Sequence, residues 1–458
     1  MTPQSENWRV LVVNRDGTEI LLKPGDTGLE LPRIVIPADQ RIAAGIVSGV
    51  EGQLGLRVIA LYQVFPQNHA IGCGDYYHGA VSQSAFPEAP GGMVWTPIRS
   101  VIAESLLQGK DAVAVETLWS RWQAEANCRH SEPFSRPGWF CEVTDWIARS
   151  LESHSLFLTG PFRQLNASST FSLIQFDTNR RPVWFKAVGE PNTREFAVTL
   201  ALAKICPDYL PEIIANKPAW RAWLTEEAAG TSLAAADCAR PWQSAAERLA
   251  LLQLLARSRK RQFCESGARD LRSRHLLELV PKFFAWVQAC QLASDGPPEE
   301  AFQTTDLSTL QDTVIHTLTA LDELDIPDTV GHMDLNPQNI FCSESGSIFL
   351  DWAESFIGCP FFSFEYLLQH FRRTHFADAL SEAELRNVYY AAWRDVLPPQ
   401  RVRAGMQLVP LAALFSYAAT LSSGNSSHSL PLPAQRRYFL RLLRKMKRMA
   451  RPGKEERT

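Results

Sequence analysis

The sequence lacks several patterns that would assign the chain to a simple class. Its nine cysteines are odd in number and form no Cys-x-x-Cys pair, so we expect reduced thiols in a cytoplasmic protein rather than a disulfide scaffold or a zinc site. No apolar run reaches the roughly 18 residues of a membrane span. The first residues have no basic flank before an apolar core, which predicts no signal peptide. A net charge of −3 argues against a generally basic nucleic-acid-binding protein.

The composition is that of a globular protein with more than one core. Of the 458 residues, 45% are hydrophobic and 21% are charged, so apolar burial can offset the chain entropy of folding. Because a chain of this length exceeds one ordinary core, we expect two or three domains.

The first 125 residues carry strand, turn and helix signals. Residues 8–13 predict a strand, Asp16-Gly17 predicts a hairpin turn, and the chain returns over 19–22. A helical pattern over 37–54 stops at Gly55. Two further strands are expected, at residues 56–64 and 76–81.

Order and spacing in this segment resemble a Nudix domain, whose hallmark is a loop and helix with several carboxylates that bind Mg²⁺ at a pyrophosphate. When that box is aligned on Gly55-Leu56, its carboxylate positions lack acids, and the nearby Glu51 is out of register. The residues found at the box positions are Gln40, Ser48, Gly49, Gly52 and Gln53. Hydrolysis is therefore not expected, and residues 1–125 are interpreted as a degenerate Nudix-like α/β domain.

The rest of the chain divides into a connector, a strand-rich region and a helical region. Proline and glycine within 126–155 indicate a linker. Strands at 170–176 and 182–188, joined by a polar turn and followed by a helix, predict a small β-containing lobe over 156–235. Residues 236–458 are mostly helical by their three- and four-residue apolar spacing.

Polar residues after residue 331 carry the chemistry. Asp334 is followed five residues later by Asn339, and Asp351 ends a short apolar run. Two carboxylates and an amide in this order can hold an acceptor hydroxyl and Mg²⁺ around a nucleotide's phosphates, with Asp334 as base and Asn339 and Asp351 as metal ligands. His332 is expected to be architectural, with its ring bonding nearby backbone. The alternative is an ordinary polar loop with a capping aspartate.

A lysine on a predicted strand could supply the second part of such a site. Lys186 is flanked by Phe185 and Ala187, and Glu195 lies early in a helix predicted over 193–206. An ammonium there could reach α- and β-phosphates, and pairing with the glutamate would fix its long side chain. Taken alone, the lysine could equally be a surface residue at a strand edge.

These residues resemble the aminoglycoside phosphotransferase-like branch of the protein-kinase fold, from about Thr159 to Phe439. The resemblance implies a two-lobed phosphotransferase domain, so the expected fold class is α+β. It implies a catalytic loop over 332–339, a metal-binding Asp351, and a hinge around Glu226 whose backbone would bond the adenine. It also implies Mg²⁺ with ATP or GTP as cofactors.

Three departures from that family pattern are visible. The phosphate-covering loop has no Gly-x-Gly-x-x-Gly; residues 166–170 stand there, and Ser168 and Ser169 are the candidate phosphate contacts. Ser363 replaces the acid after Gly-x-Pro, where it could keep an N-cap role. Residues 255–258 lack the histidine often present in the family.

The acceptor is suggested only by acids near the catalytic segment. A cationic acceptor would fit a site with several carboxylates, whereas solvated helix faces explain most of the same residues. The candidate acids are Glu354, Asp378, Glu382 and Glu384.

The C-terminal run 435–451 is a basic amphipathic helix. Its expected apolar stripe is Tyr438, Leu442, Met446 and Met449. Packing of that stripe on the helical lobe is the favoured interpretation, and contact with an anionic membrane or RNA is the alternative.

The sequence thus predicts a Mg²⁺-dependent phosphotransferase that moves a nucleotide γ-phosphate to a hydroxyl of a small molecule. Two alternatives stay open: a non-catalytic nucleotide-binding regulator, which the altered phosphate loop favours, and a protein-interaction scaffold that uses the Nudix-like domain.

Overall fold

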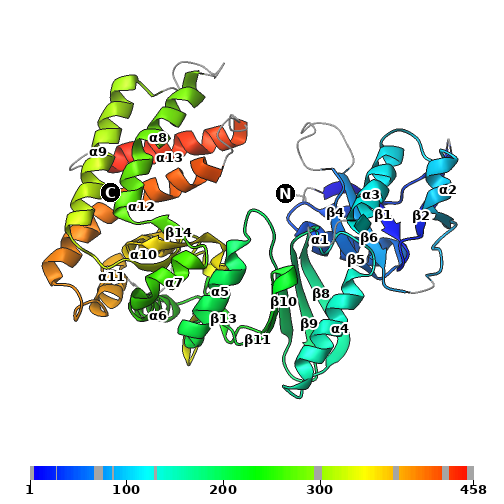
Figure 1. Ribbon diagram of the computed structural model, residues 1–458, viewed down its shortest axis with the longest axis horizontal. Helices are drawn as coiled ribbons and strands as arrows, with labels where there is room; N and C mark the ends of the chain where they lie inside the picture. Colours follow the sequence, from blue (N-terminus) through cyan, green and yellow to red (C-terminus); the bar gives the residue numbers. More distant parts are fainter. Residues whose placement is uncertain are drawn as a thin grey trace. The chain divides into compact units, whose positions relative to one another are not determined.

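The computed structural model describes residues 5–26, 28–65, 76–84, 87–127, 132–292, 302–374, 381–424 and 433–450. Its contacts divide the chain into two compact units (Figure 1). The first unit comprises Met1–Phe196 and Glu212–Glu227, and the second comprises Ala197–Pro211 and Ala228–Thr458. The mixed α+β class is as expected, whereas the finer domain boundaries drawn from the sequence stay a prediction.

The first unit begins with a mixed sheet in the order β3-β2-β1-β6-β5, in which β1 and β6 pair in parallel. The alternation of β1 sends Trp8, Val10 and Val12 into the core with helix α1, and Leu11 and Val13 into a second core. Helices therefore cover both faces. The elements are β1 (Ser5–Val13), β2 (Glu19–Gly25), β3 (Gly28–Glu30), β4 (Arg33–Pro37), α1 (Ile42–Leu54), β5 (Val58–Gln63), β6 (Tyr76–Ser82), β7 (Val94–Pro97), α2 (Ile98–Ala103) and α3 (Gly109–Asn127).

Helix α1 ends where the sequence predicts and begins later. Gly55 has φ 70°, a left-handed conformation that glycine adopts without strain, and closes the helix. Pro37, where the predicted helix begins, instead ends strand β4, which pairs with β1. A Cβ added at Gly45 would lie 2.9 Å from Ile36 Cδ1, so the helix packs closely on β4.

Positions aligned with the Nudix carboxylates serve this packing. A Cβ added at Gly49 would lie 3.0 Å from Ile34 Cδ1. The amide of Gln53 donates to Val35 O at 2.8 Å and accepts from Val35 N at 3.1 Å. These two positions hold helix and strand together and offer no carboxylate to a cation.

A second sheet in the same unit runs in the order β11-β12-β10-β9-β8 and is antiparallel throughout. It confirms both strands predicted around Lys186. The sheet shares a core with helix α4, where Trp146 packs against Phe185 and Trp139 is buried in the same cluster, so the segment interpreted as a linker contains a buried helix. The elements are α4 (Trp139–Glu152), β8 (Leu158–Ala167), β9 (Ser172–Thr178), β10 (Val183–Ala187), β11 (Ile213–Lys217) and β12 (Ala222–Glu226).

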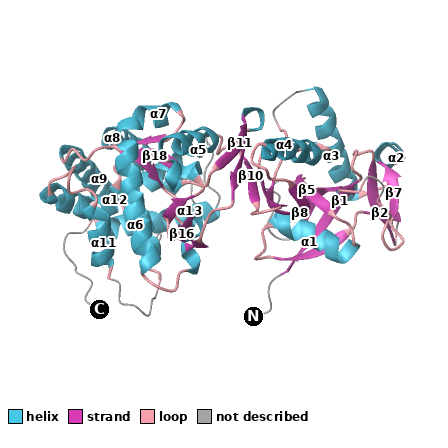
Figure 2. Cartoon of the chain, turned by 90° about the horizontal axis from the view of Figure 1, so that it is seen from below, coloured by secondary structure: helices cyan, strands magenta, loops and turns pink. Residues whose placement is uncertain are grey.

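The second unit is mainly helical, with short strands near the candidate site (Figure 2). Two three-stranded sheets, β13-β16-β17 and β14-β18-β15, lie against a large apolar core. The helices are α6 (Arg240–Ala256), α7 (Lys260–Glu265), α8 (Ser273–Leu292), α9 (Thr304–Glu323), α10 (Phe361–Phe371), α11 (Glu382–Ala391), α12 (Pro399–Gly424) and α13 (Pro433–Met449). The strands are β13 (Thr231–Ser232), β14 (Arg269–Leu271), β15 (Thr329–His332), β16 (Ile340–Ser343), β17 (Gly346–Phe349) and β18 (Ser355–Gly358).

Helix α12 corrects the expectation that no segment is long and apolar enough to cross a membrane. Residues Pro399–Ser422 meet that criterion by length and composition. Uncharged residues such as Gln407 and Ser416 do not interrupt the run, which is why inspection for purely apolar stretches missed it. More than half of the segment is buried, and Phe415 and Ala418 belong to the core, as expected of a core helix in a folded domain.

Helix α13 packs its apolar side into the same core, which confirms the favoured interpretation of the C-terminal run. Phe439, Leu443 and Met446 are buried. The predicted stripe is offset, because Tyr438 is 41% exposed. On the polar side, Lys447 pairs with Asp306 of α9 at 2.5 Å. Arg451 lies outside the described residues.

Candidate active site

Lys186 lies in the interior of its sheet. Strand β10 has β9 and β12 as neighbours, and the lysine side chain is 15% exposed, so the strand-edge alternative is wrong. Its Nζ lies 2.5 Å from Oε1 of Glu195, which is 2% exposed and opens helix α5 (Arg194–Ile205). The Lys186 ammonium also lies 5.8 Å from the centroid of the Trp223 ring. This pair is the fixed cation that the sequence predicts.

The loop expected to cover phosphates is held tightly by its own side chains. Ser168 Oγ accepts from the amides of Thr170 at 3.3 Å and Phe171 at 2.8 Å. A Cβ added at Gly189 would lie 2.1 Å from Thr170 Oγ1, so the loop rests on the turn after β10. A phosphate would have to compete with these bonds for the two amides.

Ser169 belongs to a polar cluster reaching into helix α3. The residue is 8% exposed, and its Oγ accepts from Arg121 Nη2 at 3.0 Å. Arg121 also binds Glu132 through two nitrogens and stacks over Tyr62, with its guanidinium carbon 4.3 Å from the ring centroid. The predicted nucleotide contact of Ser169 stays a prediction, and its observed contacts anchor the loop.

Glu226 ends β12, where the sequence predicts the hinge. Its amide donates to Glu212 O at 3.0 Å, and its carboxylate lies 3.9 Å from Arg181 Nη1. Gly230 follows with φ 93°, and a Cβ there would lie 2.1 Å from Cys342 O. Only glycine fits so close to that carbonyl.

The catalytic segment forms between two sheets of the second unit. Strand β15 pairs with β18, and the chain then passes through the loop 333–339 into the hairpin β16–β17. Leu350 N donates to Asn339 O at 2.8 Å, which brings the residue before Asp351 onto Asn339. Asn339 and Asp351, which are twelve positions apart in the sequence, are thus brought near each other, as the predicted hairpin spacing requires.

His332 joins the two ends of this segment. Its ring is fully buried; Nδ1 accepts from Asp334 N at 3.1 Å, so Nε2 carries the proton and donates to Leu350 O at 3.0 Å. The ring also lies against Trp352, with centroids 4.8 Å apart. The structure confirms that its ring bonds backbone, and in doing so it ties the loop of Asp334 to the loop of Asp351.

Asp334 and Asn339 are already in contact. Asn339 Nδ2 donates to Asp334 O at 3.2 Å and to Asp334 Oδ2 at 3.4 Å. Asp334 is exposed, so its other carboxylate oxygen can meet an acceptor hydroxyl. With the Asn339 nitrogen used in this way, its Oδ1 is the atom suited to a cation.

Asp351 has φ 63° and ψ 59°, a left-handed conformation that aspartate tolerates better than most residues. This turn exposes its carboxylate where β17 ends, while the next residue, Trp352, is buried.

Oxygen donors of this kind suit Mg²⁺, which takes one or two protein ligands and completes its shell with phosphates and water. Within the described ranges, no group of three or more His, Cys, Asp and Glu side chains could hold a metal ion on its own. The chemistry of Asn339 and Asp351 therefore fits a magnesium ion that arrives with a nucleotide.

Ser363 does not cap a helix, contrary to the expectation. Helix α10 starts after Pro360, which makes no side-chain capping bond, and Ser363 lies inside the first turn. Its fully buried Oγ accepts from His332 N at 2.9 Å. The serine therefore holds the backbone of the catalytic segment.

The acids proposed for a cationic acceptor are engaged elsewhere. Glu354 pairs with Arg269, and Glu384 forms a capping box with Ser381 at the start of α11. Hydrogen bonds from Arg372 lower the pKa of Glu382 to about 2. Asp378 lies outside the described residues.

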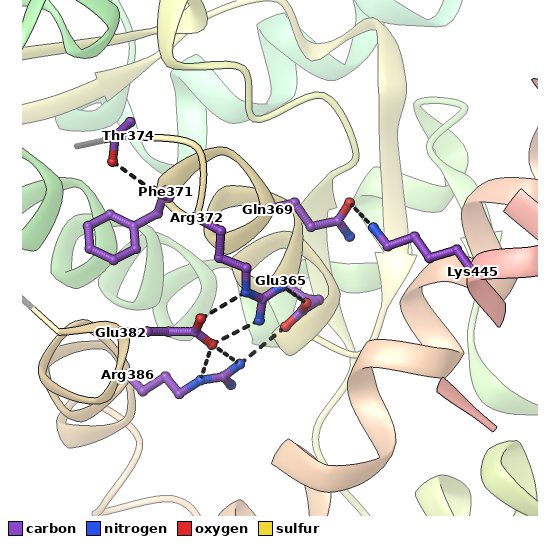
Figure 3. A network of polar contacts seen from close by, with 8 residues as sticks. All are labelled: Glu365, Gln369, Phe371, Arg372, Thr374, Glu382, Arg386 and Lys445. Carbon is purple, nitrogen blue, oxygen red and sulfur yellow. Dashed lines mark hydrogen bonds and ion pairs between the residues drawn. The ribbon is translucent and has the colours of Figure 1, made fainter. Parts of the chain in front are cut away.

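The ion pairs of Glu382 belong to a network between α10 and α11 (Figure 3). Arg372 binds Glu382 through two nitrogens, each at 2.8 Å, and binds the buried Glu365 at 2.8 Å. Arg386 contacts the same two acids at 2.6 and 3.5 Å. The network joins two helices and compensates both carboxylates.

Three polar residues of the second unit were not singled out in the sequence. The charge of Asp334 opposes the downward pKa shift that burial causes in His370, and it adds to the upward pKa shift that burial causes in Tyr417. Both side chains thus lie within electrostatic reach of Asp334. Gln253 is fully buried; it donates to Pro360 O and accepts from Tyr389. The sequence signal for Gln253 was its position as a glutamine inside the apolar run of α6.

A comparison with protein families matches part of the chain. Residues 190–398 match the phosphotransferase enzyme family. That segment contains Glu195, Asp334, Asn339 and Asp351, and it begins after Lys186. No protein of curated function matches the chain.

Several solved kinase structures align with the chain at low similarity. Macrolide 2′-phosphotransferase type I has 15% identity and a TM-score of 0.40, covering 68% of this chain and 97% of its own. Choline kinase LicA from Streptococcus pneumoniae has 10% identity and a TM-score of 0.42, covering 67% and 99%. The ethanolamine kinase of Plasmodium vivax has 12% identity and a TM-score of 0.43, covering 76% and 92%.

Proposed function

We propose that this chain is a member of the phosphotransferase enzyme family that moves the γ-phosphate of ATP or GTP to a hydroxyl of a small molecule. The observation that carries the proposal is the arrangement of the segment 332–351. His332 bonds both loops, Asn339 bonds Asp334, and Asp351 is exposed at the end of β17. The family match over 190–398 supports the same conclusion.

In this mechanism Asp334 receives or orients the proton of the acceptor hydroxyl. The bond from Asn339 Nδ2 fixes one carboxylate oxygen, and the other faces solvent, where an acceptor can approach. The amide of Asp334 is itself fixed on His332, so the base is positioned before substrate binds.

Asn339 Oδ1 and the Asp351 carboxylate would hold Mg²⁺, which supplies charge neutralisation at the transferred phosphoryl group. The Lys186 ammonium would orient nucleotide phosphates. Its partner Glu195 is 2% exposed and keeps the ammonium in place.

We further propose that the acceptor does not carry several positive charges. Recognition of a polycation requires carboxylates whose charge is not already compensated. Among the candidate acids that the structure describes, Glu354 and Glu382 are paired with arginines and Glu384 caps α11, so none of the three offers an uncompensated charge beside Asp334.

The proposal is tested by an acceptor screen with the full chain, Mg²⁺ and ATP or GTP. Nucleoside diphosphate formation should depend on one class in a panel of choline-like alcohols, sugars, macrolides, aminoglycosides and peptides. Acceptor-dependent turnover that survives Asp334→Asn would contradict the assignment of the base.

A non-catalytic nucleotide-binding regulator is the second candidate. The observation that favours it is the phosphate-covering loop, where Ser168 already occupies two amides and Ser169 is anchored on Arg121. Thermal stabilisation by ATP and Mg²⁺ without turnover on any acceptor would support this candidate over the first.

For residues 1–125 we propose a Nudix-like scaffold without hydrolytic activity. The use of Gly49 and Gln53 for packing against β4 supports this proposal. Mg²⁺-dependent release of phosphate from nucleoside diphosphate derivatives, unaffected by Asp351→Ala, would contradict it.

A further inference from the structure

A cavity of about 160 Å³ lies in the first unit, away from the residues assigned to phosphoryl transfer. The ends of β5 and β6 form one wall, and the first turn of α4 forms another. Its apolar lining includes Ile59, Val81 and Phe140. The volume equals that of roughly five water molecules at about 30 Å³ each, which is enough for a small organic molecule.

Two deeply buried polar groups of this cavity have no hydrogen-bond partner among the described residues. Ser82 and Trp139 both line it, each is 2% exposed, and neither Ser82 Oγ nor Trp139 Nε1 is satisfied. A buried polar atom without a partner costs about 1–3 kcal/mol, so native structures rarely retain one unless a ligand or water satisfies it. The indole supplies a donor, and the hydroxyl can donate or accept.

A positive charge stands at the same cavity. Arg15, in the turn between β1 and β2, lines it and donates from Nη2 to Cys141 Sγ at 3.0 Å. The turn is locked in place, because Gly17 has φ 74° and a Cβ there would lie 2.4 Å from Pro137 Cγ. The guanidinium is thus carried by a fixed element beside the start of α4.

The start of helix α4 adds further donors. Its N-cap is Gly138, which has no side chain to bond the first amides, so the amides of Trp139 and Phe140 lack the cap that most helices have. The partial positive charge of the helix terminus favours an anion there. The cavity lining contains no carboxylate, and the nearby Glu142 is paired with Arg136 at 2.6 Å.

We propose that this cavity binds a small monocarboxylate with a short apolar chain. The carboxylate bonds Arg15 and the first amides of α4, the Trp139 indole donates to it, and the chain lies against Ile59 and Val81. A single guanidinium fits a singly charged head, and the apolar walls fit a carbon chain rather than inorganic phosphate.

Isovalerate is the probe, titrated into the full chain by calorimetry with isovaleramide as its neutral counterpart. Isovalerate should bind and isovaleramide should bind at least about tenfold more weakly, because a charge-assisted hydrogen bond contributes about 1.5–3 kcal/mol. Arg15→Gln and Trp139→Phe should each weaken isovalerate binding by a similar factor. Arg180→Gln, an exposed change on the β9–β10 turn, should leave binding unchanged.

Alkylation of Cys141 gives a second readout that does not depend on calorimetry. Isovalerate should slow iodoacetamide labelling of Cys141 and leave labelling of the exposed Cys264 in α7 unchanged. Failure of isovalerate to bind at millimolar concentration, equal binding of isovaleramide, or unchanged affinity in a folded Arg15→Gln variant would each overturn the proposal. Competition by inorganic phosphate as strong as that by isovalerate would overturn the carboxylate assignment.

Discussion

Helix α1 and the segment 331–351 were both compared in the sequence with Mg²⁺-binding patterns, and they use their polar positions in opposite ways. In α1, the side-chain oxygen and nitrogen of Gln53 both hydrogen-bond the backbone of Val35, and Gly49 allows close packing on β4. In the segment 331–351, backbone is bonded by His332 and Ser363, so Asp334 and Asp351 remain exposed.

The difference shows that a site is kept by the residues beneath it as much as by its ligands. The buried side chains of His332 and Ser363 fix the two loops, so the carboxylates of Asp334 and Asp351 can lie at the surface. In α1 the polar side chain of Gln53 itself holds the helix to the strand, so it cannot also bind a ligand. Changes on each side of this comparison should therefore differ in kind: loss of turnover in the loop, and only small losses of stability in the helix.

The largest effect is expected for Asp351→Ala. Removal of a metal ligand should lower kcat by about 10³-fold or more, since a metal ion contributes several kcal/mol of charge stabilisation at the transition state. Nucleotide binding should also lose its dependence on Mg²⁺. Turnover and Mg²⁺-dependent thermal shift measure the two effects, with the exposed Asp395→Asn as control. Full turnover in the alanine variant would contradict the role.

A smaller effect on catalysis is expected from changing Lys186, the candidate phosphate-binding lysine of the first unit. Lys186→Ala should raise the KM for nucleotide by roughly 10- to 100-fold, the size of one or two charge-assisted bonds. Glu195→Gln should act in the same direction, because the ammonium then loses the carboxylate 2.5 Å away. Steady-state kinetics at varied ATP test this, with the exposed Lys204→Ala as control. An unchanged KM in both variants would remove this pair from the site.

Glu382 should affect stability rather than catalysis. Its folded-state pKa of about 2 lies below the usual 4.5, so its contribution is present above pH 4.5 and is lost as the pH falls towards 2. This contribution is at most about 3 kcal/mol, and less after solvent screening because the carboxylate is about one-third exposed. Unfolding by urea between pH 6 and about 3 should become less pH-dependent in Glu382→Gln. An identical pH profile would contradict the ion-pair account.

The smallest effect is expected at α1. Gln53→Glu introduces an acid where the proposed Nudix resemblance would have one and removes the donor to Val35 O, so it should cost about 0.5–1 kcal/mol of unfolding free energy. It should create no Mg²⁺-dependent hydrolysis of pyrophosphate bonds. Urea unfolding and a phosphate-release assay check the two outcomes, with Glu51→Gln as the matched change. New hydrolytic activity would show that the helix needs only its acids.

Much of this arrangement was predictable because it depends on local patterns. The strands around Lys186 follow from the alternation of apolar and polar residues. The end of α1 follows from the left-handed conformation of Gly55, and the hairpin before Asp351 follows from its short spacing. The placement of Lys186 in a sheet interior was not predictable, since it depends on β12, which pairs across an intervening helix.

Long-range contacts account for what the sequence did not reveal. Ser363 was expected at a helix cap, but it bonds His332 from 31 positions away. The buried face of α4 was hidden in a segment whose prolines and glycines indicated a connector, and Trp139 meets its partners only in the folded core. Of the two arginines that compensate Glu382, Arg386 lies four positions further along the same helix, a spacing visible in the sequence, whereas Arg372 at the end of α10 pairs with it only in the folded structure.

Transfer of phosphate itself tests the central claim most directly. With Mg²⁺, the natural nucleotide and an acceptor found by the screen, ³¹P NMR should show a new phosphate ester formed by the wild type. Asp334→Asn should bind nucleotide with unchanged affinity and form that ester about 10²- to 10⁴-fold more slowly, as expected for loss of a general base. Ester formation at the wild-type rate in Asp334→Asn would contradict the account.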